Sequence, residues 1–271
     1  KNPSAFAVYE LTPDMEERYL EAGERILDLV AYWQRLHEEE KLDREKAVPI
    51  TRMYRIVYKV HMYFEPAETD IPAQLEMYKQ AVYDVVSARY PCSKEDSSLL
   101  AGLQMQAEYG DAGCPEMTDD PETKILSHFV QSGMLSTPES GKEMAGDVLA
   151  EHKKHAGKTS KEARNEYLTT VKKWKIYGSS FFFVEPQMST LGDEVFLAVN
   201  PSGILLINPD SKEVLADHPY SEVPTWGHSG ASFVLHIGNL IKQDKLYFQT
   251  EQGKEINDLV RAYVNHMCSG M

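Results

Sequence analysis

The sequence is poor in cysteine and in long apolar runs. Three cysteines, Cys92, Cys114 and Cys268, are too few and too widely spaced for a disulfide framework, which favours a reducing compartment. No apolar run approaches the roughly 18 residues that a membrane-spanning helix needs. No basic segment followed by an apolar one opens the chain, so no secretory leader is predicted.

Signatures of catalysis are also missing. The sequence has no Gly-x-Ser-x-Gly elbow, no His-Glu-x-x-His pair and no glycine-rich phosphate loop. His152 and His155 could share a helix face, but no third metal ligand lies near them in sequence. We therefore expect no catalytic residue, cofactor or metal. An enzyme that uses the acidic surface, such as a hydrolase, is the weakest of the hypotheses.

The sequence has fewer basic than acidic residues. The 271 residues include 42 acidic and 28 Lys or Arg residues, and the net charge is −14. Such a surface repels polyanions, so we expect no nucleic-acid partner. The hydrophobic share of 42% is ordinary for a folded chain, which at this length has room for one large domain or several small ones.

Residues 1–66 have the pattern of a small α+β lobe. Residues 6–11 and 54–64 are rich in β-forming side chains, and residues 24–37 carry apolar residues at helical spacing. Ile26, Leu27, Val30, Trp33 and Leu36 form that apolar stripe. Because two strands and a helix cannot bury a sheet face alone, we expect the chain to begin partway through this lobe.

Residues 67–174 have the pattern of a helical bundle. Asp70 followed by Pro72 predicts the start of one helix, and Pro91 predicts its end. Ser93 and Thr159 each head a capping-box pattern that predicts a further helix. Residues 110–121 contain Gly110, Gly113, Pro115 and Pro121 and are predicted to form a loop.

Residues 175–271 contain seven short apolar runs and then one amphipathic helix. Turn clusters separate the runs, which predicts an antiparallel barrel or sandwich. The apolar stripe of the last helix is Ile256, Leu259, Val260, Tyr263, Val264 and Met267. Its spacing predicts that this helix covers an open end of the barrel.

Several segments together resemble the FERM family. They are residues 78–91 and 103–110 in the helical part, and 177–182, 198–204 and 250–256 in the last part. The resemblance implies an α+β multi-lobe fold: a partial ubiquitin-like lobe, an acyl-CoA-binding-protein-like bundle and a PH/PTB-like barrel capped by a helix. Residues 24–33 are most similar to FERM domains in the tails of unconventional myosins, whereas the last lobe is also similar to that of talins.

The resemblance implies a non-catalytic adaptor that lies in the cytoplasm at the membrane and the actin cortex. Its expected partners are cytoplasmic tails of membrane proteins or other protein cargo. As part of a myosin tail it would link them to an actin motor; the alternative is a talin-like head that binds adhesion-receptor tails and phosphoinositides.

A peptide site is expected on the third lobe, because ligands of PTB-like folds add a strand beside the fifth strand and contact the last helix. The implied residues are Ser221, Glu222, Val223, Thr225, Trp226, Asn257, Val260, Arg261 and Val264. The alternative is that the apolar members belong to the core. Pro224 favours an edge strand but removes one donor, which places an Asn-Pro-x-Tyr-type ligand in doubt.

A basic block interrupts the acidic chain at residues 152–175, with eight basic residues against two acidic ones. Its predicted binding residues are Lys153, Lys154, Lys158, Lys161, Arg164, Lys172 and Lys173. Such a block could bind phosphoinositides or an acidic partner, including a motor head in an inhibited state. The alternative is a solvated helix face without a ligand.

Overall fold

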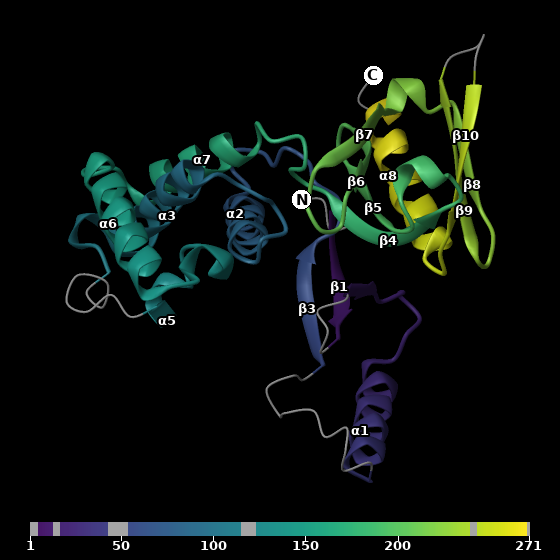
Figure 1. Cartoon of the computed structure of the whole chain (residues 1–271), viewed down its shortest axis with the longest axis horizontal. Coiled ribbons are helices and arrows are strands. Elements are labelled where there is room, and N and C mark those ends of the chain that lie inside the picture. The colour runs from purple at the N-terminus through teal and green to yellow at the C-terminus, as the bar shows by residue number, and fades with distance from the viewer. Residues whose placement is uncertain (1–4, 13–16, 43–53, 115–122, 239–242, 270–271) are drawn as a thin grey trace. The chain divides into compact units, whose positions relative to one another are not determined.

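The computed structural model describes the chain except for residues 1–4, 13–16, 43–53, 115–122, 239–242 and 270–271 (Figure 1). It divides into two compact units, Lys1–Met62 and Tyr63–Met271. Each unit is built as its local sequence predicts, and each is described separately below.

The first unit contains a three-stranded antiparallel sheet. Its strands are β1 (Phe6–Leu11), β2 (Glu17–Tyr19) and β3 (Arg55–Val60), in the order β2-β1-β3. The strands predicted at residues 6–11 and 54–64 are confirmed as β1 and β3. The short β2 was missed, because three residues are too few to show an alternating pattern. The expectation that this lobe lacks its opening strands stays a prediction.

Helix α1 (Ile26–Leu42) confirms the predicted helix in the first unit. Its indole donor, Trp33 Nε1, binds Glu10 Oε1 of β1 at 2.6 Å, and the Trp33 ring stacks on Tyr54. The start of its apolar stripe is exposed: Ile26 is 49% and Leu27 81% exposed. Among the described residues of α1 the stripe is half-buried at best.

The second unit begins with a helical bundle. Its α-helices are α2 (Ile71–Val86), α3 (Lys94–Tyr109), α5 (Thr123–Leu126), α6 (Pro138–Lys154) and α7 (Ser160–Val171). The predicted caps are confirmed, since Asp70, Ser93 and Thr159 each accept a hydrogen bond from a backbone N–H of the first turn. Residues 115–121 of the predicted loop lie outside the described part of the chain.

A seven-stranded antiparallel sheet follows the bundle (Figure 1). Its strands are β4 (Ser180–Pro186), β5 (Val195–Asn200), β6 (Gly203–Ile207), β7 (Val214–Pro219), β8 (Thr225–His228), β9 (Ser232–Gly238) and β10 (Gln243–Gln249). Their order is β7-β6-β5-β4-β10-β9-β8, so β7 and β8 are the two ends of the sheet. All seven predicted runs contain strand residues.

Helix α8 (Gly253–Ser269) packs on β5, β8 and β9. Ile256, Leu259, Val260 and Tyr263 are buried, as the stripe predicts, whereas Met267 at its end is 39% exposed. The helix therefore closes the interior of the sandwich with its first three turns.

The bundle and the sheet share one core. Side chains from both, including Tyr167 of α7 and Leu205 of β6, belong to a single buried cluster. The Tyr90 hydroxyl also accepts a 2.8 Å hydrogen bond from the backbone N–H of Gly178. The predicted lobe boundaries after residues 66 and 174 stay predictions.

Candidate docking site on the sheet edge

Strand β8 is an edge strand. In the described part of the chain it pairs with β9 alone, in an antiparallel register that places Trp226 opposite Leu235. Thr225 and His228 are exposed and Trp226 is half-buried. An edge of this kind presents unpaired backbone donors and acceptors to a further strand.

The backbone groups that face outward can be assigned from the hairpin. Ser229 N–H donates to Ser232 O at 2.9 Å, so residue 229 faces β9. Because the backbone alternates with a period of two residues, Thr225 and Gly227 also face β9. Trp226 and His228 therefore direct their N–H and C=O groups to the open side.

Helix α8 runs along this edge in the opposite direction to β8. At its start, a Cβ added to Gly253 would lie 2.6 Å from Ser232 O and 3.3 Å from His228 Cβ. Two to three turns later, the Tyr263 ring lies 6.3 Å from the ring of Tyr220, which precedes β8. A strand added to β8 would thus lie beside α8.

The structure corrects part of the predicted peptide site. Ser221 and Glu222 belong to the 3-10 turn Tyr220–Glu222, and Val223 is 5% exposed, so these residues are not strand residues. Pro219 and Pro224 bracket this turn, and a proline without an N–H ends the pairing of a strand. Of the predicted strand residues, only Thr225 and Trp226 lie in β8.

The predicted helix residues also divide into two groups. Asn257 and Val260 are 4% and 0% exposed and belong to the core, so neither can present its side chain to a ligand. They lie on the same face as Ile256 and Leu259, and the core alternative, which concerned the apolar members, is correct for Val260. Arg261 is exposed and Val264 half-buried, so both remain accessible.

Sequence analysis did not include His228 in the edge strand. It lies in the cluster Gly227-His228-Ser229-Gly230, which was interpreted as a turn. The strand continues through His228, and the turn begins only at Ser229. The exposure of β8 does not alternate, because Trp226 and Gly227 are both half-buried, and four residues are too few to show a strand pattern in the sequence.

The basic block is divided by the length of α7. Lys153 and Lys154 end α6, Lys161 and Arg164 lie early in α7, and Lys172 and Lys173 follow its last residue. A helix of 12 residues is about 18 Å long, so the block forms two separate groups of cations.

Carboxylates neutralise half of the eight cations. Lys154 pairs with Glu151, Lys158 with Glu166, Lys172 with Glu65 and Lys175 with Asp217. Lys153, Lys161, Arg164 and Lys173 have no ion pair with a described carboxylate. Burial and the neighbouring Lys158 ammonium lower the pKa of His155, so this imidazole adds no charge to the block at neutral pH.

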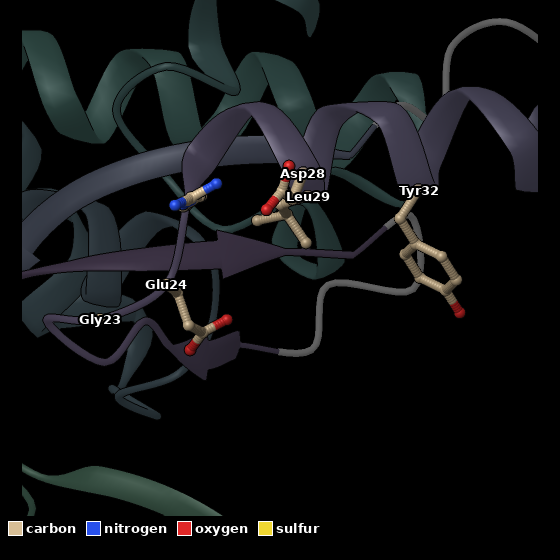
Figure 2. Close-up of a pocket in the computed structure, with 6 residues that line it drawn as sticks. Gly23, Glu24, Asp28, Leu29 and Tyr32 are labelled. Atoms are coloured by element: carbon tan, nitrogen blue, oxygen red, sulfur yellow. The ribbon is translucent and has the colours of Figure 1, made fainter.

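A shallow hollow lies at the start of α1 in the first unit. Gly23, Glu24, Arg25, Asp28, Leu29 and Tyr32 line it. Figure 2 shows Glu24 on the segment before the helix and Asp28, Leu29 and Tyr32 on the helix itself. The Glu24 carboxylate is held by Arg18, whose Nη1 lies 2.9 Å from Glu24 Oε2. The hollow combines both signs of charge with one aromatic ring and has no convergent set of reactive groups.

Two further searches of the described residues gave no candidate. No helix among them combines the length and the apolar character that crossing a bilayer requires. No three His, Cys, Asp or Glu side chains of this part of the chain are arranged as metal ligands.

Two family models match the second unit. The FERM central domain matches residues 68–182, and the PTB domain of the IRS-1 type matches residues 182–268. Together they cover the helical bundle, the seven-stranded sheet and most of α8.

Curated relatives include two unconventional myosins and a talin. Drosophila melanogaster myosin-VIIa is 28% identical over 72% of this chain, and Mus musculus unconventional myosin-VIIb is 26% identical over 83%. Talin of Oscarella pearsei is 27% identical over 72%. The chain spans only 9%, 11% and 8% of these three proteins.

The solved structures support the fold. The C-terminal MyTH4-FERM domain of human myosin 7b, in complex with the harmonin-a PDZ3 domain, is similar with a TM-score of 0.66 and 23% identity. The match covers 97% of this chain and 52% of that one. For the MyTH4-FERM MF2 domain of Dictyostelium discoideum myosin VII (mutant 1), the TM-score is 0.74, the identity 15% and the coverage 97% and 52%. The chain therefore contains a FERM central domain followed by a PTB-like domain, and it resembles the FERM modules of unconventional myosins and, as a further match, talin.

Proposed function

We propose that this FERM module is a non-catalytic adaptor that docks extended segments of cargo proteins, including the cytoplasmic tails of membrane proteins. The observation that carries the proposal is the open edge of β8 beside α8. Trp226 and His228 direct backbone donors and acceptors outward there, and Arg261 and Val264 remain accessible on the helix. Main-chain pairing along such an edge provides affinity, while adjacent side chains select the sequence.

Within this proposal the module is part of an unconventional myosin tail and links its cargo to the actin cytoskeleton at the membrane. Similarity to myosin-VIIa and myosin-VIIb over most of the chain supports the proposal that the module belongs to a myosin tail. A talin-like head that binds adhesion-receptor tails and phosphoinositides is the alternative, favoured by the talin match. The protein sequence that precedes Lys1 would separate the two.

Pro224 narrows the choice of ligand. Pro224 comes directly before β8 and has no N–H, so it offers no donor to a strand added at Thr225–His228. A ligand strand would pair with Trp226 and His228 and not with Pro224. An Asn-Pro-x-Tyr-type tail peptide is therefore expected to bind more weakly than one whose pairing ends at Trp226.

The unpaired cations of the basic block form a second contact of the adaptor. Lys153 and Lys161 are exposed and lie where α6 ends and α7 begins. We propose that they hold an anionic partner, either a phosphoinositide surface or the motor head of the same protein in an inhibited state.

The docking edge can be tested with one matched pair of variants. Fluorescent peptides from cytoplasmic tails are titrated with the protein, and binding is followed by fluorescence anisotropy. His228→Pro removes the outward N–H, whereas His228→Ala removes the same side chain and keeps that donor. For a peptide that binds the wild type, we expect affinity to fall about tenfold or more in the proline variant only.

One of the titrated tail peptides contains an Asn-Pro-x-Tyr sequence. Equal affinities for His228→Pro and His228→Ala, with both variants folded by circular dichroism, would exclude β8 as the docking edge. Tight binding of the Asn-Pro-x-Tyr tail above all other peptides would favour the talin-like alternative.

A further inference from the structure

The sheet also opens in its interior, between β4 and β10 and away from its two end strands β7 and β8. Strand β10 pairs with β9 over all seven of its residues, from Gln243 to Gln249. It pairs with β4 only at its carboxyl end, where Phe248 lies opposite Pro186 and Gln249 opposite Glu185. Between β10 and β4 the sheet therefore opens over the first residues of β10.

The cause of the gap is the end of β4. After Pro186, one more hydrogen bond joins this part of the chain to β10: Gln187 N–H donates to Tyr247 O at 2.9 Å. The chain then turns into the 3-10 helix Ser189–Leu191 and leaves the sheet before it returns as β5. No β4 residue remains to pair with the part of β10 before Tyr247.

The outward backbone groups of β10 follow from this bond. The backbone C=O of Tyr247 faces β4. Because backbone orientation repeats every two residues, the backbone groups of Lys245 and Gln243 also face that side. The β8–β9 hairpin supports the same assignment independently, since it directs Phe233 and Leu235 of β9 toward Phe248 and Leu246. Lys245 thus presents one N–H and one C=O to the gap, and β9 cannot pair with either.

The surroundings of the gap are acidic. Glu185, Asp193 and Glu194 line a hollow where the β4–β5 connection meets the end of β4, and all three are exposed. None of them has an ion pair with another described residue. Asp244 is exposed on β10 itself, whereas Lys245 is the one cation among the β10 residues whose side chains are described.

Next to these groups, the Tyr247 ring is 41% exposed. It follows Lys245 on the same face of β10, because alternate residues of a strand share a face. An exposed aromatic ring beside carboxylates is a suitable contact for a Lys or Arg side chain.

We propose that the open part of β10 binds an extended basic segment of a partner protein as an additional strand. The backbone of the segment pairs with the backbone of Lys245 and, nearer the start of β10, with that of Gln243. Its cationic side chains contact Glu185, Asp193 and Glu194, and Tyr247 contacts one of them through its ring. The site is distinct from the β8 edge, because β9 and β10 lie between β8 and the gap.

The partner is a basic protein segment and not a second copy of this chain. The net charge of −14 opposes self-association through an acidic edge. The edge is also short, since only the part of β10 before Tyr247 is open, which suits a short linear segment better than the face of a folded domain.

A pair of variants tests the backbone contact. The probe is a fluorescein-labelled peptide of alternating lysine and valine, and its counterpart has glutamate in place of lysine. Lys245→Pro removes the outward N–H, and Lys245→Ala is the matched control that removes the same charge. Proline is tolerated at an edge position whose N–H faces away from the ladder.

We expect the basic peptide to bind the wild type and Lys245→Ala, and to lose about tenfold or more of its affinity for Lys245→Pro. The double variant Asp193→Lys with Glu194→Lys should weaken binding by a similar factor, and raised salt should weaken it for the wild type. His228→Pro should leave this binding unchanged, which separates the β10 edge from the β8 edge.

Three results would overturn the proposal. They are equal affinity for Lys245→Pro and Lys245→Ala, equal binding of the glutamate peptide, and no binding of the lysine peptide. A dimer in sedimentation velocity that Lys245→Pro abolishes and Lys245→Ala retains would assign the edge to a second copy instead. Circular dichroism and thermal unfolding show whether each variant is folded before its affinity is compared.

Discussion

The backbone N–H of Tyr63 donates a 3.0 Å hydrogen bond to the hydroxyl of Tyr263, which lies 200 residues further along the chain. Both residues are buried, and the Tyr63 hydroxyl donates in turn to Asp84 of α2 at 3.2 Å. Tyr263 on α8 therefore joins the last helix of the second unit to the first residue of that unit and, through Tyr63, to the helical bundle.

We expect Tyr263→Phe to destabilise the second unit. The phenyl ring keeps the packing on Tyr220, but the Tyr63 N–H loses its acceptor inside the protein, which costs about 1–3 kcal/mol. Urea unfolding of the two proteins measures the difference. Tyr247→Phe, at an exposed ring, is the control and should be nearly neutral; an equal stability of Tyr263→Phe and the wild type would contradict the role of this bond.

Gly102 allows α3 and α6 to approach closely. A Cβ at this position would lie 2.8 Å from both Glu151 Cβ and His152 N. We expect Gly102→Ala to lower the free energy of unfolding by about 1–3 kcal/mol, because the two helices must move apart. Thermal unfolding by differential scanning calorimetry measures this loss.

Gly146 of α6 provides the opposite case for the same substitution. It is exposed, and a Cβ there would meet no atom within 4 Å. Gly146→Ala should stabilise the protein by up to about 1 kcal/mol, through the higher helix propensity of alanine. A stable Gly102→Ala would show that α3 and α6 are not as close as the structure places them, and a destabilised Gly146→Ala would show that position 146 is not as open as the structure places it.

The first unit should lose stability in mild acid because of His61. Burial, with a smaller effect of the Lys59 ammonium, lowers the pKa of His61 from 6.5 to about 4. Between these values the unfolded chain binds a proton that the folded unit does not. The free energy of unfolding therefore falls as the pH is lowered from about 6.5 to about 4, by up to about 3 kcal/mol.

The His61→Gln variant should remove most of this pH dependence, although it disturbs the 2.6 Å contact with the Tyr9 hydroxyl. The indole resonance of Trp33 in NMR spectra reports unfolding of this unit, because Trp33 binds Glu10 of β1. If the unfolding transition of the wild-type first unit does not shift between pH 6.5 and pH 4, the buried, neutral state of His61 is contradicted.

The proposed anionic contact depends on Lys153 and Lys161. Reversing both charges to glutamate should weaken binding to phosphatidylcholine vesicles that contain phosphatidylinositol bisphosphate by about tenfold or more, since each lysine near an anionic surface contributes about 1 kcal/mol. Vesicle co-sedimentation measures the change. Lys79→Glu with Lys142→Glu alters the net charge equally, and an identical loss in that control would show that only total charge matters.

Local patterns in the sequence were sufficient for most of the elements. The caps at Asp70, Ser93 and Thr159 are determined by side chains within three residues of the backbone that they bind. The seven strands follow from short apolar runs separated by turn residues, and the stripe of α8 follows from its helical spacing. These signals are local, and they can be recognised without knowledge of the partner surface.

Patterns could not show which apolar residues remain accessible. Val260 and Val264 lie on the same stripe, yet the first is completely buried and the second half-buried, because β5, β8 and β9 cover only part of α8. The basic block was contiguous in sequence, but α7 divides it, and carboxylates from distant segments such as Glu65 and Asp217 neutralise part of it.

The sequence by itself determined the local conformations and the order of a small α+β part, a helical bundle and a helix-capped sheet, because caps, turns and periodicity act between neighbours in the chain. Only the tertiary structure decided which backbone groups are left open. Pairing at β8 and β10 depends on where other strands end, such as β4 at Pro186, and the open edges on which both docking proposals rest are properties of the assembled sheet.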